Sequence, residues 1–117
     1  MSLTDTPSLS RPSKSLLDLI GNTPMVEVTK LDTGKCRLLI KLESQNPGGS
    51  IKDRIALNMI EAAENSGLLQ PGGTIVEATA GNTGLALTLV GKQKGYNVLL
   101  VIPDKMSKEK IQHLRAM

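Results

Sequence analysis

Phenylalanine and tryptophan are absent from the 117-residue sequence, and Tyr96 is its only aromatic residue. Proteins that bind single-stranded nucleic acids usually stack bases on several aromatic side chains, so this composition disfavours that function. The single cysteine, Cys36, excludes an internal disulfide bond and fits a reducing cytoplasm. Because Cys36 precedes an apolar strand, we expect it to be buried. With one cysteine and one histidine, the sequence lacks the ligand cluster of a metal site.

Long apolar runs and a strong excess of one charge are also missing. No run approaches the ~18 residues that a membrane-spanning helix needs, and the first residues lack the apolar segment of a secretory signal. Fourteen basic and eleven acidic side chains give a net charge of only +3, which does not favour a nucleic-acid partner. The length and the 39% apolar content predict a cytoplasmic globular domain with an aliphatic core.

Apolar runs alternate with helical stripes along most of the sequence. We expect a mobile arm over residues 1–14 and one α/β domain over residues 15–117. From residue 37 onward the expected order is strand, helix, strand, helix, strand, helix. This order predicts a three-layer fold, a parallel sheet with flanking helices. The expected strands are 25–28, 37–42, 74–78 and 97–102, and the expected helices are 16–20, 51–65, 83–94 and a last one from residue 107.

Two glycine-rich loops, residues 43–50 and 78–84, each leave the carboxyl end of an expected strand and enter a helix. In one parallel sheet both loops would lie on the same rim, which is where ligands bind in such folds. The continuous apolar run over residues 97–102 is typical of a strand that is covered on both faces.

Lys52 is the first candidate functional residue. Ser50 and Asp53 have the spacing of a capping box, which predicts a helix that begins at Ser50 and places Lys52 in its first turn. A cation there meets the positive end of the helix dipole, and the same field favours the neutral amine that a nucleophilic lysine needs. An ordinary solvated lysine beside Asp53 is the alternative, and the spacing alone favours it.

The loop TAGNTG provides the second group of candidates. Gly81 lets the backbone approach a ligand closely, and the following helix would direct free N–H groups at the loop. Thr79, Asn82 and Thr83 add side-chain donors. The pattern fits a phosphate or carboxylate site, and an ordinary helix cap fits it equally well. It matches neither the dinucleotide-binding fingerprint nor the P-loop.

Four stretches together resemble a known family. IGNTPMVEV, KLESQNPGGSIKDR, TIVEATAGNTGLAL and VIPDKMSKEKIQHLRAM are similar, in this order, to the N-terminal part of the cystathionine β-synthase and cysteine synthase family. These are pyridoxal-phosphate enzymes of fold type II, and the resemblance covers about residues 16–117. It implies the small N-terminal domain of such an enzyme. Because the last helix has no closing strand after it, we expect the chain to be an incomplete N-terminal fragment.

The resemblance implies a role for each candidate residue. Lys52 matches the lysine that binds pyridoxal phosphate covalently and later removes the α-proton of the substrate. Asn82 matches the asparagine that hydrogen-bonds the 3′-oxygen of the cofactor. Thr79, Gly81, Asn82 and Thr83 match the loop that binds the substrate carboxylate. The implied reaction is β-replacement on serine or O-acetylserine with a thiol or sulfide, and the implied full-length form is a homodimer.

Two other functions stay open. A serine or threonine dehydratase of the same fold type would share the lysine, although IGNTP and NPGGSIKDR argue against it. A non-catalytic remnant or interaction module would keep the scaffold alone. The resemblance places a Gly-rich phosphate cradle and a partner for the pyridine nitrogen after Met117, so we expect the 117-residue chain by itself to be inactive. A Gly-rich loop after Met117 would favour the enzyme, and a stop codon would favour the remnant.

Overall fold

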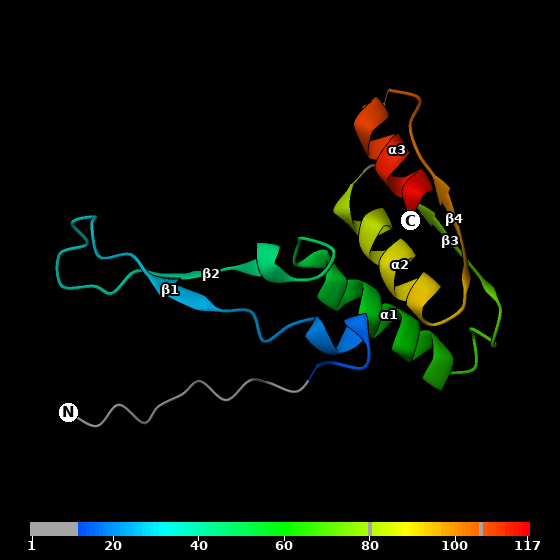
Figure 1. The fold of residues 1–117 in the computed structure, drawn as a ribbon, viewed down its shortest axis with the longest axis horizontal. Helices are drawn as coiled ribbons and strands as arrows, with labels where there is room; N and C mark the ends of the chain where they lie inside the picture. The colour runs from blue at the N-terminus through cyan, green and yellow to red at the C-terminus, as the bar shows by residue number, and fades with distance from the viewer. Residues whose placement is uncertain (1–11, 80, 106) are drawn as a thin grey trace.

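The computed structural model describes residues 12–79, 81–105 and 107–117. Residues 1–11 of the expected arm therefore lie outside the described residues. Helices and a parallel pair of strands confirm the α/β class (Figure 1). The elements in chain order are the 3₁₀ helix η1 (Leu16–Leu19), strands β1 (Met25–Glu27) and β2 (Leu39–Lys41), the 3₁₀ helix η2 (Glu43–Gln45), helix α1 (Lys52–Asn65), strand β3 (Thr74–Ala78), helix α2 (Asn82–Gln93), strand β4 (Asn97–Val101) and helix α3 (Lys108–Ala116).

The described strands form two separate two-stranded sheets (Figure 1). β3 and β4 are parallel, with Thr74 opposite Asn97. β2 does not join them but pairs antiparallel with β1, with Met25 opposite Lys41. The expectation of one parallel sheet from residue 37 onward is therefore wrong for this strand. The connection between β1 and β2 is short enough for an antiparallel hairpin, and an apolar run indicates a strand without indicating its partner.

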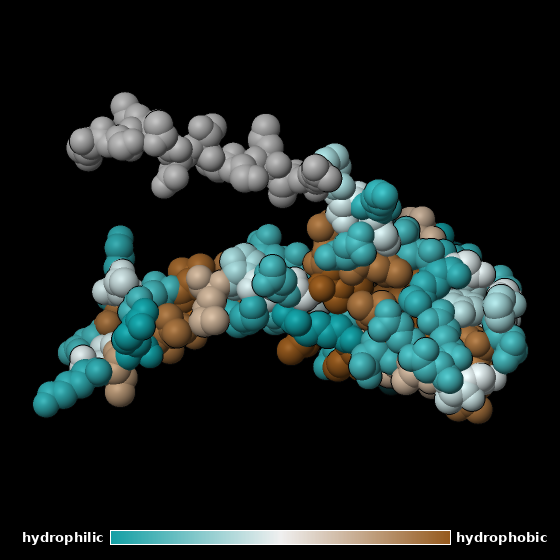
Figure 2. Space-filling model, turned by 90° about the horizontal axis from the view of Figure 1, so that it is seen from below, coloured by the Kyte–Doolittle hydropathy of each residue, from teal (hydrophilic) through white to brown (hydrophobic). Residues whose placement is uncertain are grey.

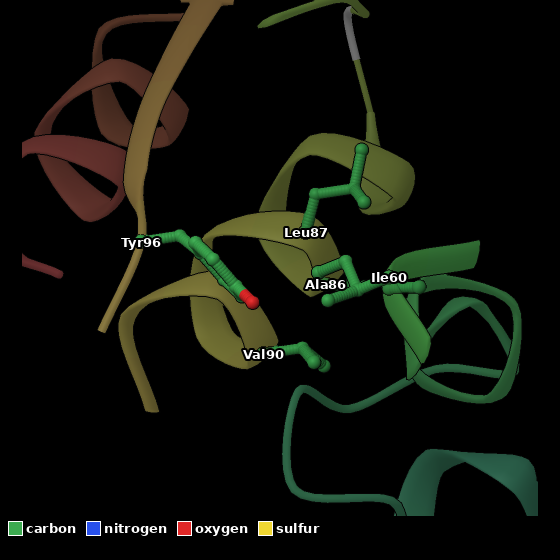
Figure 3. Close-up of a cluster of buried hydrophobic side chains, with 6 residues drawn as sticks. Ile60, Ala86, Leu87, Val90 and Tyr96 are labelled. Atoms are coloured by element: carbon green, nitrogen blue, oxygen red, sulfur yellow. The ribbon is translucent and has the colours of Figure 1, made fainter. Parts of the chain in front are cut away.

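Helix α2 packs on one face of the β3–β4 sheet, and α1 packs against α2 (Figure 1). Apolar residues of α1 and α2 recur at spacings of three and four, so each helix presents an apolar stripe to its neighbour. These stripes form the centre of the buried core (Figure 3). The buried apolar residues are Ala56, Ile60, Ala86, Leu87, Val90 and Tyr96.

A polar cluster joins the carboxyl ends of α1 and α2. The Lys94 ammonium donates a hydrogen bond to Oε2 of Glu64 at 2.7 Å, and the Tyr96 hydroxyl donates to Oε1 of the same carboxylate at 2.7 Å. Glu64 lies in the last turn of α1, whereas Lys94 and Tyr96 follow the end of α2. The two helices therefore end side by side, which means that they also run in the same direction.

Two glycines of α2 determine how closely the helix approaches the sheet. Gly84 and Gly91 are both buried and lie seven residues, or about two turns, apart. A Cβ atom at Gly84 would lie 2.5 Å from Cγ2 of Thr79, and one at Gly91 would lie 2.8 Å from Cγ2 of Val98. Neither position has room for a larger residue at the present distance between helix and sheet.

The other face of the β3–β4 sheet is open. Val76, Leu99 and Val101 expose 60%, 57% and 57% of their surface. The expectation that residues 97–102 are covered on both faces is therefore not met within the described part of the chain. An apolar run indicates that both faces of a strand need cover, but it does not indicate which residues supply that cover.

The β1–β2 hairpin extends away from the helices and carries apolar side chains on its surface (Figure 2). Cys36 lies in the turn of this hairpin and is exposed, so the expectation that it is buried is wrong. The apolar strand after Cys36 is itself exposed in all its residues, which explains why its apolar character was a poor guide to burial. Among the described helices, none combines the length and the apolar character of a membrane span.

Candidate functional site

Helices α1 and α2 begin at the same end of the helix pair (Figure 1). Lys52 is the first residue of α1, and Asn82 is the first residue of α2. The free N–H groups and the positive dipole ends of both helices are therefore directed to one region. The structure thus brings Lys52 and Asn82 to one end of the helix pair, although β2 and β3, which precede their loops, belong to different sheets.

The start of α1 differs from the expected capping box. The Lys52 N–H donates a hydrogen bond to Oγ of Ser50 at 3.1 Å, but the carboxylate of Asp53 does not return to Ser50. It accepts instead from the N–H of Gly48, which lies further back in the loop. α1 begins at Lys52, and Ile51, which precedes it, offers no side-chain cap, so Ser50 supplies the side-chain acceptor at this helix start. The expectation of a helix that begins at Ser50 is therefore wrong, because Asp53 holds the preceding loop and not the helix end.

The Lys52 side chain is half-buried, and its ammonium has no hydrogen-bond or ion-pair partner among the described residues. Lys94, at the other end of the helix pair, differs in this respect because it forms an ion pair with Glu64. The unpaired amine is therefore available to a ligand at the helix starts.

The loop before α2 leaves that helix open at its first turn. The Thr79 N–H donates to the Val101 carbonyl at 3.0 Å, and the Thr79 hydroxyl oxygen accepts from the Gly81 N–H at 3.3 Å. Gly81 precedes the helix in an extended conformation and supplies no side chain to cap it. Asn82 is exposed and Thr83 is half-buried. Asn82 and Thr83 are therefore not N-caps, so the interpretation of this loop as an ordinary capped crossover loses its support.

A polar cluster that none of the candidate residues indicated lies beside the start of α1. Its centre is the carboxylate of Glu43, which accepts from Nε of Arg54 at 2.8 Å and from Nη2 of Arg54 at 2.9 Å. Thr23 Oγ1 donates to Oε1 of Glu43 at 2.5 Å, and Asn46 Nδ2 donates to its Oε2 at 3.0 Å. We name these four residues the Glu43 cluster.

The Glu43 cluster connects three stretches that are distant in the sequence. The Gly21 N–H donates to Oδ1 of Asn46 at 2.8 Å, and this bond attaches the IGNTP stretch to the loop before α1. Gly21 has a positive φ of 84°, and a Cβ atom there would lie 2.9 Å from Nη1 of Arg54. The residues of the cluster lie within the motifs that carry the family resemblance. That resemblance was therefore the sequence signal that could have indicated them.

The Glu43 cluster predicts a specific loss of stability in acid. Its hydrogen bonds, first those from Arg54 and then that from Thr23, lower the pKa of Glu43 from 4.5 to about 2. A carboxyl whose pKa is lower in the folded state stabilises the fold above its unfolded pKa, and this contribution is lost as the pH falls from about 4.5 to about 2. We expect Glu43→Gln to reduce the pH dependence of the denaturation midpoint in this range.

The measurement is chemical denaturation of both proteins at several pH values across that range. Glu27→Gln is the matched control, because Glu27 forms an ion pair with Arg37 on the exposed hairpin. It should change the pH dependence much less, since water screens exposed pairs. An equal effect of the two substitutions would contradict the importance of the Glu43 cluster.

Three clefts of the structure are lined by residues other than Lys52 and Asn82. One, of ≈ 570 Å³, is lined by residues of α2, β4 and α3, including Thr88, Leu100 and Ile111. Neither Lys52 nor Asn82 lines it. The candidate site at the two helix starts is therefore distinct from this cleft.

Residues 16–117 match the family of pyridoxal-phosphate dependent enzymes. Among curated relatives, the cystathionine β-synthase of Mus musculus is 51% identical over 93% of this chain and 20% of that protein. The cysteine synthase of Dictyostelium discoideum is 51% identical over 87% of this chain and 27% of that protein. This chain thus spans about a fifth to a quarter of the length of these two relatives.

Solved structures agree with the sequence matches. A hydrogen sulfide-producing enzyme from Fusobacterium nucleatum is similar with a TM-score of 0.86 and 49% identity, over 92% of this chain and 36% of that one. A cystathionine β-synthase from Bacillus anthracis gives a TM-score of 0.73 and 44% identity, over 90% of this chain and 40% of that one. The family match includes both helix starts of the candidate site, and the resemblance in the motifs is confirmed. The chain belongs to the family of pyridoxal-phosphate dependent enzymes.

Proposed function

We propose that the full natural chain catalyses a pyridoxal-phosphate dependent β-replacement on serine or O-acetylserine, with a thiol or sulfide as the second substrate. The observation that carries the proposal is the meeting of two helix starts, one with the unpaired amine of Lys52 and one with Asn82. The names of the relatives, cystathionine β-synthase and cysteine synthase, favour this reaction over elimination alone.

The described residues fit the cofactor. Pyridoxal phosphate carries an aldehyde, which needs a free amine, and oxygen atoms, which need hydrogen-bond donors. Lys52 offers an amine without a partner, and the Asn82 amide lies exposed at the same end of the helix pair. When bound, the cofactor acts as an electron sink for the carbanion at the substrate α-carbon. Lys52 would hold it covalently, and the Asn82 amide would donate a hydrogen bond to its 3′-oxygen.

The remaining groups of the loop would bind the substrate. A carboxylate at the start of α2 would meet free N–H groups and the positive end of the dipole. Gly81 leaves space there, because nothing lies within 4 Å of the position of its missing Cβ. Thr79, Asn82 and Thr83 would orient the carboxylate so that the α-proton faces Nζ of Lys52. That nitrogen, once free of the cofactor, would take up the proton.

We further propose that the full-length enzyme is a homodimer in the cytoplasm. The family resemblance implies a homodimer, and the single cysteine fits the cytoplasm.

Borohydride reduction of the purified full natural chain, followed by peptide mapping, tests the proposal. Borohydride fixes the cofactor to the amine that holds it, and the modified peptide identifies the residue. We expect the label on Lys52. Lys30 and Lys41 serve as internal controls, since both are exposed lysines of the hairpin region. A label on either of them in place of Lys52 would contradict the assignment.

Asn82→Ala provides a separate prediction. We expect a changed absorbance spectrum of the bound cofactor and a turnover lower by roughly 10²-fold, as for the loss of one well-placed donor. The unfolding midpoint should stay the same, because Asn82 is exposed and caps nothing. Asn58→Ala, at an exposed position within α1, is the control. If Asn82→Ala lowered stability and left the spectrum unchanged, the residue would serve the fold and not the ligand.

A further inference from the structure

Asp53, the neighbour of Lys52, is a fully buried carboxyl in the first turn of α1, with an exposure of 0%. Its Oδ2 accepts a hydrogen bond from the Gly48 N–H, and its Oδ1 has no partner among the described residues. Burial raises the pKa of Asp53, and the bond from Gly48 lowers it to a smaller extent. An exposed aspartate would interact equally well with the helix dipole. Because the burial of a poorly paired carboxyl is unfavourable, it indicates a further role for Asp53.

The loop before α1 is shaped around this carboxyl. A Cβ atom at Gly48 would lie 2.3 Å from Oδ1 of Asp53, so any other residue at position 48 would displace the carboxyl. Gly49 is different, since nothing surrounds its missing Cβ and its φ of 80° accounts for the glycine. Glycine is therefore required at these two adjacent positions for different reasons. At position 49 the reason is the positive φ, and at position 48 it is the contact with Asp53.

A short chain of contacts connects Asp53 with Lys52. Asp53 holds Gly48, and the Gly49 N–H donates to the Asn46 carbonyl at 2.8 Å, which closes the turn. Ser50 follows this turn, and its Oγ accepts from the Lys52 N–H. The backbone direction at Lys52 is thus fixed from both sides, by the helix after it and by the loop that Asp53 holds before it.

We propose that Asp53 is a positioning residue: its buried carboxyl holds the loop 46–50 through Gly48 and thereby fixes the direction in which Lys52 leaves the start of α1. Only the consequence for Lys52 rests on the proposed function. The hydrogen bond between Gly48 and Asp53, which holds the loop, can be tested without any cofactor.

Four single variants of the full natural chain test separately whether Asp53 holds the loop and whether it thereby positions Lys52. Asp53→Asn keeps the size of the side chain and an oxygen that can accept from Gly48, whereas Asp53→Ala removes the acceptor. Gly48→Ala forces a methyl group against the carboxyl. Asp32→Ala is the matched control, because Asp32 also accepts from a glycine N–H, that of Gly34 at 3.0 Å, but lies in the exposed hairpin turn.

Two measurements are made on each variant. The first is the hydrogen-exchange rate of the Gly48 amide, which measures directly how well the hydrogen bond to Asp53 protects that amide. The second is the rate at which pyridoxal phosphate, added to the apoprotein, becomes fixed to Lys52 by borohydride in samples taken over time. We expect Asp53→Ala to speed the exchange and to slow the attachment, each by roughly tenfold or more, because small misplacements of a reacting group have large effects on rate. Asp53→Asn should stay within about threefold of the wild type in both, and Asp32→Ala should change neither.

The outcomes discriminate between the parts of the proposal. Unchanged attachment in Asp53→Ala, or equal slowing in Asp53→Asn and Asp53→Ala, would overturn the positioning role. If Asp53→Ala does not fold, Gly48→Ala decides, because it must slow the attachment while Asp53→Asn does not. If wild-type Lys52 takes no label, the proposed function fails. The hydrogen-exchange rate of Gly48 then shows whether Asp53 holds the loop. An unchanged rate in Asp53→Ala would overturn that part of the proposal.

Discussion

Lys52→Ala in the full natural chain is expected to lose β-replacement by roughly 10⁴-fold or more, because one substitution removes both the anchor of the cofactor and the base for the α-proton. The variant should still fold. The Lys52 ammonium has no hydrogen-bond or ion-pair partner among the described residues, so its removal breaks no polar interaction there. Turnover of serine or O-acetylserine, together with the visible absorbance of the bound cofactor and the unfolding midpoint, measures the two effects separately.

Lys41→Ala is the matched control for this substitution. The Lys41 ammonium donates to the Thr23 carbonyl, so its loss should affect stability while the cofactor remains attached. Added small primary amines should partly restore activity to Lys52→Ala, since they can replace the missing base but not its position. Full activity of Lys52→Ala without added amine would exclude the assigned role.

Gly91→Ala is expected to destabilise the fold by about 1–3 kcal/mol, although glycine-to-alanine changes within helices usually stabilise. The new methyl group would lie 2.8 Å from Cγ2 of Val98 and 3.2 Å from Cδ1 of Ile75. Val98 is a short β-branched residue on a strand and cannot turn away, so the helix and the sheet must separate. Gly84→Ala should act in the same way against Thr79. Chemical denaturation gives the free energy of unfolding for each variant.

Two further variants show whether contact with the sheet is the cause. Gln93→Ala, at an exposed position near the end of α2, should be nearly neutral. Val98→Ala removes the atom that Gly91→Ala would meet, so the double variant should lose less than the sum of the two single losses. A rise in stability for Gly91→Ala alone would show that helix propensity outweighs the contact.

The helices and strands were largely predictable because their signals are local. The strand over residues 74–78 agrees with β3 at both ends, and the helix expected at 51–65 begins one residue later as α1. Strand partners were less predictable, because β2 has the apolar character of a parallel strand and yet pairs with β1. The expectation that Cys36 is buried was wrong for the same reason, since the burial of Cys36 depends on what the hairpin packs against.

The candidate site was predictable only in part. Lys52 and Asn82 stood out by their place at helix starts, and the structure brings these two starts together. The partners of Glu43 and of Asp53 could not be derived from spacing. Glu43 contacts Arg54 eleven residues away and Thr23 twenty residues away, and such pairs depend on the path of the chain. Asp53 had the spacing of a capping box, but the loop gave its carboxyl a partner at Gly48.

The open face of the β3–β4 sheet has a consequence for the synthesis of the protein. In the described part of the chain this sheet has two strands, so both its edges carry free backbone groups beside an exposed apolar surface. A ribosome that has released these residues and is still adding others presents both features to the surrounding solution. Free sheet edges next to apolar side chains are templates for pairing between chains. In any longer chain that contains these residues, the time until later segments cover this sheet therefore determines how much nascent protein depends on chaperones.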